Sequence, residues 1–405
     1  MPTGTVTVTF DSAGGSAVPQ MELKKGATIG MGAVSTRAHA DFDGWYLGTE
    51  RWDPSSPVQE DVTLVARWIP HSTEGLCFVA TQGGYEVSAY TGTSKEVVIP
   101  FEHDGQPVVS VAQGAFNGAL DLTALVLPAS VESVGTELLG LTSLVNLELP
   151  AHLITSVGQN AGTLERVIIN GGTEIPAGAF MGCGVLDVVE MPNTITKIGN
   201  GAFSSCFCLT SIYIPAGVTE IGVGAFSDCM KLVEVKNDSA TPVSVMTPSE
   251  SGLGEYALNV YSSTSGTSKL TVVDEYVFID ADDATYLVSY RGHDTTLNLP
   301  QIGRPYKLHN RSFFNTGAFT SVVMPEGVTE IGYEAFYGCG HILHFSFPRS
   351  LNYIAYSAIF NCAYVESATY AGTVSEWNAM EKHAMWNLHA YSFPIYCTDG
   401  TTYSR

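Results

Sequence analysis

A block of about 23 residues repeats along this chain, and it limits what the chain can fold into. Cys183, Cys206 and Cys229 follow one another at intervals of 23 residues, and Cys339 and Cys362 repeat that interval. A fixed period of this length is typical of a solenoid, in which each unit buries its apolar face only against its neighbours. The sequence therefore predicts a repeat protein rather than a globular domain with one central core.

The order of features inside a block predicts the structure of one unit. Leu209, Ile212 and Ile214 alternate with other residues, as in a strand with one inward face, and Pro215 ends the strand. An Ile-Gly pair then supplies a second inward residue and a bend, and Ala-Phe begins a short helical turn. The predicted fold is a solenoid of parallel strands with short helical turns, in which the phenylalanine packs between successive units.

The cysteines are explained by the same repeat. Five of the eight occupy one position of the block, which Ala119 fills in an earlier copy, so we expect them to be buried core residues. A zinc site needs pairs of close cysteines with two further ligands, and Cys206 and Cys208 form the only close pair. We expect Cys77 and Cys397 to be unpaired, and we expect no metal and no cofactor.

The repeat motif is similar to that of a known family. Ile212, Ile214 and Pro215, then Ile221-Gly222, then Ala225-Phe226 and Cys229 match every position of the BspA-like, or Treponema pallidum-type, leucine-rich repeat. The resemblance covers roughly residues 97–236 and 296–370. It implies a leucine-rich repeat protein of the bacterial surface or a secreted one, engaged in adhesion or protein–protein contact.

The first 68 residues follow another pattern. Strand-like residues 5–10 and 62–68 flank a Gly-Trp-Tyr segment at residues 44–46, and this order resembles the Listeria–Bacteroides repeat, also called the InlB B-repeat. That resemblance implies a small β-grasp-like module that acts as a spacer or contacts a partner. The first three residues carry no signal peptide, so we expect the export signal to be absent from this chain.

A large internal duplication organises the remainder. A hairpin pattern with Tyr90 and Gly92 returns with Tyr290 and Gly292, which predicts two arrays that each begin with a capping hairpin. We expect Ser375–His383 to have helical character and Pro394–Cys397 to form a final strand. The predicted domains are 1–70 (β-grasp-like module), 76–236 (first array with its hairpin cap), 237–275 (irregular insertion), 276–370 (second array) and 371–405 (C-terminal cap).

Composition excludes several classes of partner. The formal net charge is -22, from 40 acidic and 18 basic residues without a basic cluster, so neither nucleic acid nor an anionic membrane is an expected partner. Asp280, Asp282 and Asp283 offer a calcium ligand set, but their segment also predicts a hairpin turn and lacks the glycine and final glutamate of an EF-hand loop. Scattered histidines and the absence of catalytic motifs predict that the chain is not an enzyme.

The strand positions that alternate with the inward residues form the candidate ligand face. Solenoids bind extended partners with such a surface, and we expect an extracellular protein, bacterial or from a host, to contact a monomer there. The candidate residues are Val126, Glu148, Arg166, Ile168, Val188, Glu190, Ser211, Tyr213, Glu234, Lys236, Val323 and His344.

Two other functions fit the sequence. A carbohydrate-binding surface protein would use exposed aromatic side chains, for which Trp45, Tyr46, Trp377 and Trp386 are the candidates, and Trp68 could join the first two. In a small domain such residues also serve as core. A purely structural stalk would have no ligand at all.

Overall fold

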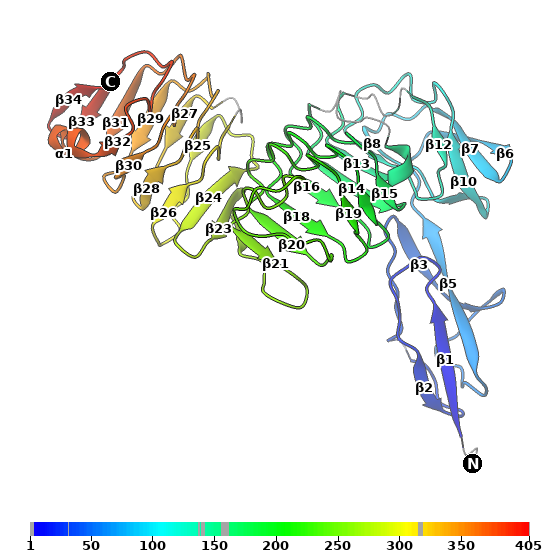
Figure 1. The fold of residues 1–405 in the computed structure, drawn as a ribbon. Coiled ribbons are helices and arrows are strands. Elements are labelled where there is room, and N and C mark those ends of the chain that lie inside the picture. Colours follow the sequence, from blue (N-terminus) through cyan, green and yellow to red (C-terminus); the bar gives the residue numbers. More distant parts are fainter. Residues whose placement is uncertain are drawn as a thin grey trace. The chain divides into compact units, whose positions relative to one another are not determined.

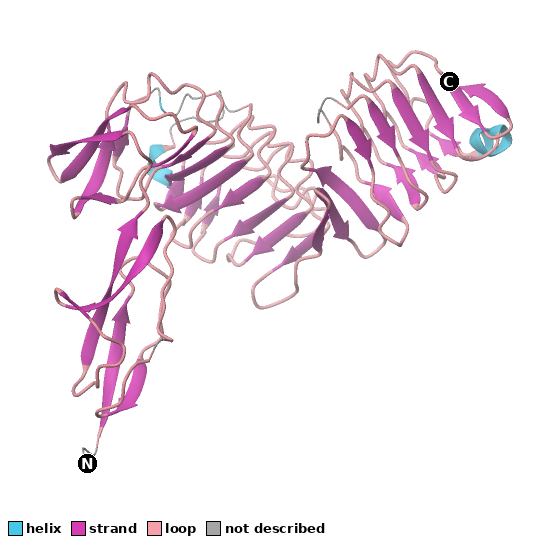
Figure 2. Cartoon of the chain, turned by 180° about the vertical axis from the view of Figure 1, so that it is seen from behind, coloured by secondary structure: helices cyan, strands magenta, loops and turns pink. Residues whose placement is uncertain are grey.

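The computed structural model describes residues 4–30, 32–136, 138, 142–154, 162–314 and 319–404. The chain forms two compact units, residues 1–141 and 142–405, which are described separately. Strands dominate both, as Figure 2 shows in magenta, and they confirm the predicted β-rich solenoid.

The first unit contains the amino-terminal module and the start of the first array. Its strands are β1 (Thr5–Asp11), β2 (Met21–Lys24), β3 (Ala40–Leu47), β4 (Glu50–Arg51), β5 (Val62–Pro70), β6 (Leu76–Thr81), β7 (Gly84–Tyr90), β8 (Glu96–Val98), β9 (Glu102–His103), β10 (Gln106–Val111), β11 (Ala124–Val126) and β12 (Ser133–Val134). Strands β1 to β5 form one mixed sheet in the order β2-β1-β5-β3-β4. The predicted hairpin is present as β6 and β7, and β10 continues from it in parallel.

The amino-terminal sheet has an aromatic core. Trp45 and Trp68 are 4% and 8% exposed, and the Trp45 ring lies 4.8 Å from the Phe10 ring. Their indole N–H groups donate to the carbonyl oxygens of Ala33 and Ser12, so both polar atoms are satisfied inside the module. These two tryptophans are therefore core residues, and a carbohydrate platform built on them is wrong.

The second unit carries the remaining rungs. Its elements before the second hairpin are β13 (Asn146–Pro150), the 3-10 helix η2 (Ala151–Leu153), β14 (Arg166–Gly171), β15 (Glu174–Ile175), β16 (Val188–Glu190), β17 (Lys197–Ile198), β18 (Ser211–Ile214), β19 (Glu220–Ile221), β20 (Glu234–Asn237) and β21 (Asn259–Tyr261). Parallel pairs join β13 to β14 and β14 to β16, and likewise β18 to β20 and β20 to β21. Figure 1 shows these strands in successive turns of the solenoid.

The second half of this unit repeats the plan. Its elements are β22 (Leu270–Val273), β23 (Tyr276–Asp280), β24 (Thr285–Tyr290), β25 (Thr296–Asn298), β26 (Tyr306–Leu308), β27 (Ser321–Val323), β28 (Val328–Ile331), β29 (His344–Phe347), β30 (Tyr353–Ile354), β31 (Ser367–Tyr370), α1 (Val374–Ala379), β32 (Glu381–Lys382), β33 (Pro394–Cys397) and β34 (Gly400–Tyr403). Two sheets run along it, one from β22 to β32 and one from β25 to β34.

Stacked side chains hold the rungs together. Phe180, Phe203 and Phe226 are fully buried and stack at 5.4 and 5.3 Å between ring centroids, and Phe313 and Phe336 do the same at 4.9 Å. The Phe203 ring thus lies between the rings of the two neighbouring rungs, as the repeat predicts. Such stacking makes the stability of one rung depend on the next.

The repeated cysteines are buried free thiols, as expected, and some of them also form a hydrogen bond that was not predicted. Cys206 Sγ lies 3.3 Å from the Phe180 carbonyl oxygen, and Cys229 Sγ lies 3.1 Å from that of Phe203, one rung earlier in each case. Burial raises the pKa of the Cys229 thiol to about 12, so the thiol stays protonated and can donate. A cysteine here therefore fills the core and satisfies a carbonyl group as well.

The second hairpin is a joint rather than an end cap. Phe278 and Leu287 pack into the core of the second array, whereas Ile279 and Val288 pack against Val233 of the preceding array. Both faces of the hairpin are therefore buried, which an end cap would not require. The segment before it contributes a further rung, because β21 pairs in parallel with β20 and the Phe226 N–H donates to the Ser251 carbonyl oxygen.

The carboxyl-terminal cap differs in detail from the expectation. Helix α1 covers Val374–Ala379 and ends earlier than the predicted helical segment, since β32 begins at Glu381. Thr373 and Glu376 form a reciprocal capping box that fixes its start. The predicted final strand is present as β33, and β34 pairs with it as an additional antiparallel strand. Trp377 and Trp386 are 2% and 1% exposed within this cap.

Candidate partner-binding surface

The outward residues of the second unit's first strands form two rows. The strand registers align Arg166 with Val188 and Ile168 with Glu190, and they also align Tyr213 with Lys236. Each row runs perpendicular to the strands and contains one residue from each rung. The first row is Asn146, Arg166, Val188, Ser211, Glu234 and Asn259, and the second row is Glu148, Ile168, Glu190, Tyr213, Lys236 and Tyr261. Strands β13, β14 and β16 belong to one sheet and β18, β20 and β21 to the next, and the 23-residue repeat relates positions 188 and 190 to 211 and 213.

The middle of the second row combines apolar and charged contacts. Lys236 Nζ lies 4.5 Å from the centre of the Tyr213 ring, and the Tyr213 hydroxyl contacts Asn193 Oδ1 at 3.3 Å. Partial burial raises the pKa of Tyr213, so its hydroxyl is neutral at physiological pH. Ile168 stays half-buried two rungs away. Together these residues give a partly apolar strip with a fixed cation, a composition suited to contact with another protein.

The first row is more polar. Arg166 and Glu190 form an ion pair between neighbouring strands, and both side chains remain exposed. Val188 and Ser211 are half-buried beside them. Exposed ion pairs of this kind contribute little to stability, so the side chains of Arg166 and Glu190 can each pair with a group of a bound protein instead.

Two predicted face residues are buried instead. Glu234 is 3% exposed, because its carboxylate accepts hydrogen bonds from Asn259 Nδ2 at 2.7 Å, Ser268 Oγ at 2.6 Å and the Lys269 N–H at 2.8 Å. Glu148 is 9% exposed and accepts a bond from Asn170 Nδ2. Both residues therefore hold neighbouring rungs and loops in place, and the expectation that they face a ligand is wrong.

The role of Glu234 gives a testable prediction. Changing Glu234→Ala removes three acceptor contacts to residues 259–269, and we expect local opening of that segment to become easier by about 1–2 kcal/mol. Hydrogen–deuterium exchange of peptides covering 262–270 measures this change. Ser211→Ala in the preceding rung is the matched control and should leave the exchange of that segment unchanged.

The remaining candidate residues lie on other strands. Val126 is half-buried on β11 in the first unit. In the second array Val323 is 40% exposed on β27, and the exposed His344 on β29 contacts Ser367 Oγ through Nδ1 at 2.9 Å. Arg166, Ile168, Val188 and Glu190 are thus aligned by register on one sheet, and Ser211, Tyr213 and Lys236 are aligned on the next. Strands β16 and β18 are in contact where the two sheets adjoin, whereas Val323 and His344 belong to a third sheet.

The aromatic and acidic alternatives are also placed by the structure. Trp377 and Trp386 are buried, and Tyr46 has Arg67 over its ring at 4.1 Å, so the predicted sugar-stacking residues offer no open platform. Residues 280–285 form the predicted hairpin turn. The aspartates there are engaged by protein groups, with Asp280 bound to Arg304 and Asp282 bound to Lys269.

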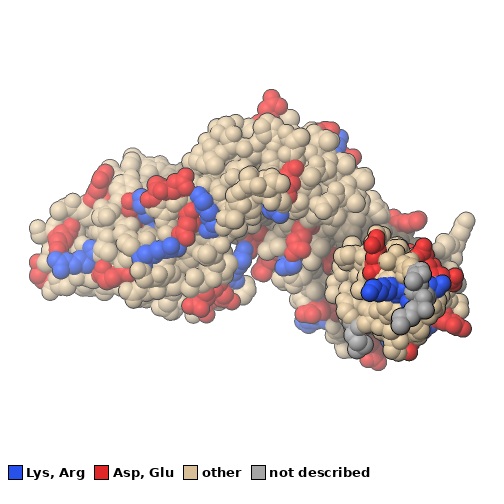
Figure 3. Space-filling view, turned by 90° about the horizontal axis from the view of Figure 1, so that it is seen from below, with Lys and Arg blue, Asp and Glu red and all other residues tan. Residues whose placement is uncertain are grey.

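Charged side chains are interleaved over the second array rather than segregated. Figure 3 shows acidic and basic side chains next to one another on the face in view. The pairs in this array include Arg304 with Asp280, Lys307 with Glu330 and Arg311 with Glu334. On this face the basic side chains are thus dispersed among acidic ones.

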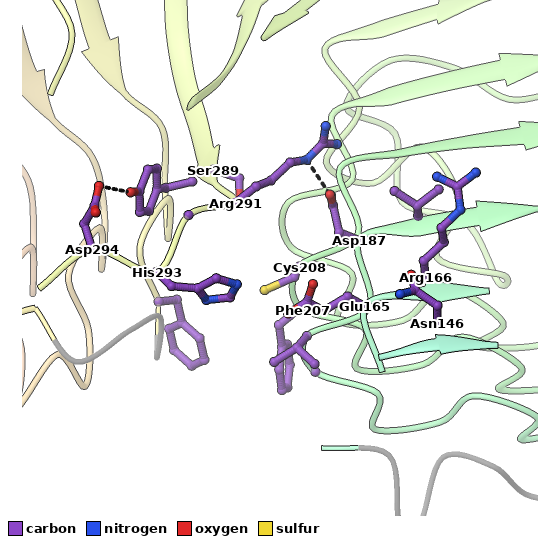
Figure 4. Close-up of a pocket in the computed structure, with 16 residues that line it drawn as sticks. Asn146, Glu165, Arg166, Asp187, Phe207, Cys208, Ser289, Arg291, His293 and Asp294 are labelled. Atoms are coloured by element: carbon purple, nitrogen blue, oxygen red, sulfur yellow. Dashed lines mark hydrogen bonds and ion pairs between the residues drawn. The ribbon is translucent and has the colours of Figure 1, made fainter. Parts of the chain in front are cut away.

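A groove of about 730 Å³ lies beside the first row, where the two arrays meet. We call it the joint groove. One wall comes from the first array and the other from the second array, where the end of β24 and the loop after it form most of it (Figure 4). Its lining residues are Asn146, Glu165, Arg166, Gly184, Val185, Asp187, Val188, Phe207, Cys208, Ser289, Tyr290, Arg291, Gly292, His293, Asp294 and Phe314.

Family models match most of the chain. The BspA type leucine rich repeat region matches in six copies over residues 93–163, 109–233, 159–282 and 296–397. The chain belongs to the BspA-type leucine-rich repeat family. Its amino-terminal module matches the Listeria-Bacteroides repeat domain over residues 7–67. Both resemblances seen in the sequence are confirmed, and proteins of this family are repeat surface proteins that are typically not enzymes.

Individual relatives are similar over shorter or more divergent stretches. A protein of Evansella cellulosilytica described as a membrane protein is 41% identical over 66 residues, which are 15% of this chain and 10% of that protein. The chain spans about a tenth of the length of the curated relatives it matches. In the described part of this chain, no helix is long and apolar enough to cross a membrane.

Solved structures of leucine-rich repeat proteins also align with the chain. A leucine rich cell surface protein of Faecalibacterium prausnitzii is 21% identical, with 77% of this chain and 97% of that chain covered and a TM-score of 0.29. The pneumococcal vaccine antigen PcpA is 14% identical, with coverage of 79% and 87% and a TM-score of 0.29.

Proposed function

We propose that this chain is an adhesive protein of the bacterial surface that binds an extracellular protein partner through the strand face of its second unit. The observation that carries the proposal is the strip formed by Ile168, Tyr213 and Lys236, which lies on strands fixed in register by buried inward residues. A rigid, partly apolar strip with tyrosine at its centre is the kind of surface on which binding energy concentrates.

The family supports the location and the class of role. BspA-type repeats occur in bacterial surface proteins, and the matched solved structure from Faecalibacterium prausnitzii is described as a cell surface protein. The amino-terminal module then serves as a spacer or as a second contact. Because three of the four proposed sugar-stacking residues are buried, the structure gives the carbohydrate alternative no comparable support.

A binding screen followed by surface variants tests the proposal. The full chain is screened at physiological salt against extracellular-matrix proteins, mucins and a glycan panel. For a protein hit, Tyr213→Ala and Ile168→Ala should each weaken binding by about tenfold or more, as expected for residues central to an interface.

Val223→Ala provides the control, since Val223 is 64% exposed but lies outside the two rows. It should change the affinity less than twofold. A protein hit that tolerates both face substitutions would contradict the proposal, a glycan hit that tolerates them would favour the carbohydrate alternative, and no hit in any class would favour a structural stalk.

A further inference from the structure

The joint groove continues from the first row of the proposed binding face. Asn146, Arg166 and Val188 belong both to that row and to the groove lining. The opposite wall comes from residues 289–294 and Phe314, more than a hundred positions later in the chain than these three residues. A partner lying on the strand face would therefore meet this groove at the edge of its contact area.

Most charged groups of the groove are already paired. Arg291 Nε binds Asp187, which also accepts a bond from Thr210 Oγ1 at 3.1 Å, and the Tyr290 hydroxyl donates to Asp294 at 2.6 Å. Figure 4 shows the Arg291 and Tyr290 contacts as dashed lines. Arg166 is paired with Glu190 outside the groove.

One carboxylate stays without a partner. Glu165 lines the groove and is half-buried, and its side chain has no hydrogen-bond or ion-pair partner among the residues that the structure describes. The lining holds three carboxylates against two guanidinium groups. The groove thus contains one unpaired carboxylate that can accept hydrogen bonds from a cation, in a chain whose net charge is -22.

The lining also contains apolar side chains. Val185 is 38% exposed, and the Phe207 ring lies 5.7 Å from the Phe314 ring at a tilt of 57°. The centre of the Arg311 guanidinium lies 5.5 Å from the centre of the Phe314 ring. An aromatic ring of the groove lining therefore already has a guanidinium group over one of its faces.

We propose that the joint groove receives an arginine side chain from an extended basic segment of the partner protein. The aliphatic stem would pack on Val185 and Phe207, and the planar guanidinium would bond to the Glu165 carboxylate. The negative charge of the chain would steer a basic segment towards the groove. This inference rests on the proposed function, since it names the chemistry of the partner that the strand face binds.

Other ligands fit the groove less well. An acidic side chain would meet the unpaired Glu165 carboxylate and the negative field of the chain. A lysine could bond to the carboxylate but lacks the planar surface that packs on an aromatic ring. The groove should therefore prefer arginine to lysine, and lysine to glutamate.

Peptide binding to the full chain tests this order. The probe is a labelled, capped octapeptide of alternating serine and valine with one central arginine, and two companions carry lysine or glutamate there. Fluorescence anisotropy should show the arginine peptide binding at least tenfold more tightly than the glutamate peptide. Glu165→Gln should weaken arginine-peptide binding about tenfold, because a charge-assisted bond is lost.

Glu250→Gln is the matched control, since it removes the same charge from an exposed side chain outside the groove. It should change the affinity less than twofold. Unchanged unfolding of Glu165→Gln in urea confirms that the variant is folded. Failure of the wild-type chain to bind the arginine peptide, equal binding of the glutamate peptide, or full affinity in Glu165→Gln would each overturn the inference.

The same variants separate this inference from the proposed function. For a protein partner found by the screen, loss of binding with Tyr213→Ala but not with Glu165→Gln would contradict the arginine site and leave the strand face in place. Loss with neither variant would contradict the proposed function as well.

Discussion

Replacing Phe203 with alanine should destabilise the second unit by about 3–5 kcal/mol. Phe203 is fully buried between Phe180 and Phe226, with ring centroids at 5.4 and 5.3 Å. Removing the ring leaves a cavity that neighbouring rungs can close only by moving relative to one another. Because a rung in a solenoid contacts only its neighbours, this loss interrupts the stack at one point.

Urea unfolding followed by far-ultraviolet circular dichroism measures the effect. Met181→Ala is the control, since Met181 follows Phe180 directly but is 51% exposed, and it should cost less than about 0.5 kcal/mol. A loss below about 1 kcal/mol for Phe203→Ala would show that the stacked rings are not a main source of cohesion between rungs.

The stability of the second unit should fall by about 2 kcal/mol between about pH 7 and about pH 5 because of His309. Burial lowers the pKa of His309 from 6.5 to about 4. Its Nδ1 contacts the Asn310 carbonyl oxygen at 3.0 Å, and the Tyr286 ring meets it edge to face at 5.7 Å. The neighbouring Lys231 amino group is buried without a hydrogen-bond partner among the described residues, and its charge further disfavours protonation.

Stability falls at low pH because His309 takes up a proton more readily in the unfolded chain than in the folded one. Well above pH 6.5, His309 is neutral in both the folded and the unfolded chain, and the stability of the second unit is highest. As the pH falls from 6.5 towards 4, the unfolded chain binds a proton that the folded chain does not, so unfolding becomes easier.

Urea unfolding at several pH values measures how the free energy of unfolding changes with pH. His309→Leu should largely remove the loss between about pH 7 and about pH 5, whereas His341→Gln, at an exposed position, should keep it. An unchanged slope in His309→Leu would mean that another group controls the pH dependence.

The repeat made most of the fold predictable. Period and composition are local properties, so the parallel rungs, the stacked phenylalanines and the buried cysteines follow from single blocks. The hydrogen bonds from the thiols of Cys206 and Cys229 to the preceding rung do not follow in this way, because they depend on the offset between rungs. Even so, a cysteine rather than an alanine at a repeated core position was a signal for a donor.

The joint between the arrays could not be derived from the repeat. Lys231 occupies the same block position as the exposed residues Val185, His341 and Tyr364, yet it is 1% exposed and lies near His309 of the second array. One signal was available. Residues Tyr276–Ile279 are all apolar, and such a run without alternation is typical of a strand buried on both faces.

The candidate site was predictable only as a surface. Alternation along each strand located the two rows, but it could not show that the loop at 262–270 covers Glu234. The joint groove combines residues from position 146 to position 314, and only the folded chain brings them together. The burial of residues that contact distant segments therefore could not be predicted from the sequence.

The most direct test of the proposed function is a hydrogen–deuterium exchange footprint of the full chain with a protein partner found by the screen. We expect slower exchange in peptides that cover residues 166–171 and 211–214, with Tyr213 and Ile168 inside the protected area. Protection confined to residues 4–70, or to the strands β15, β17 and β19, would contradict the account, because the strand face would then stay free in the complex.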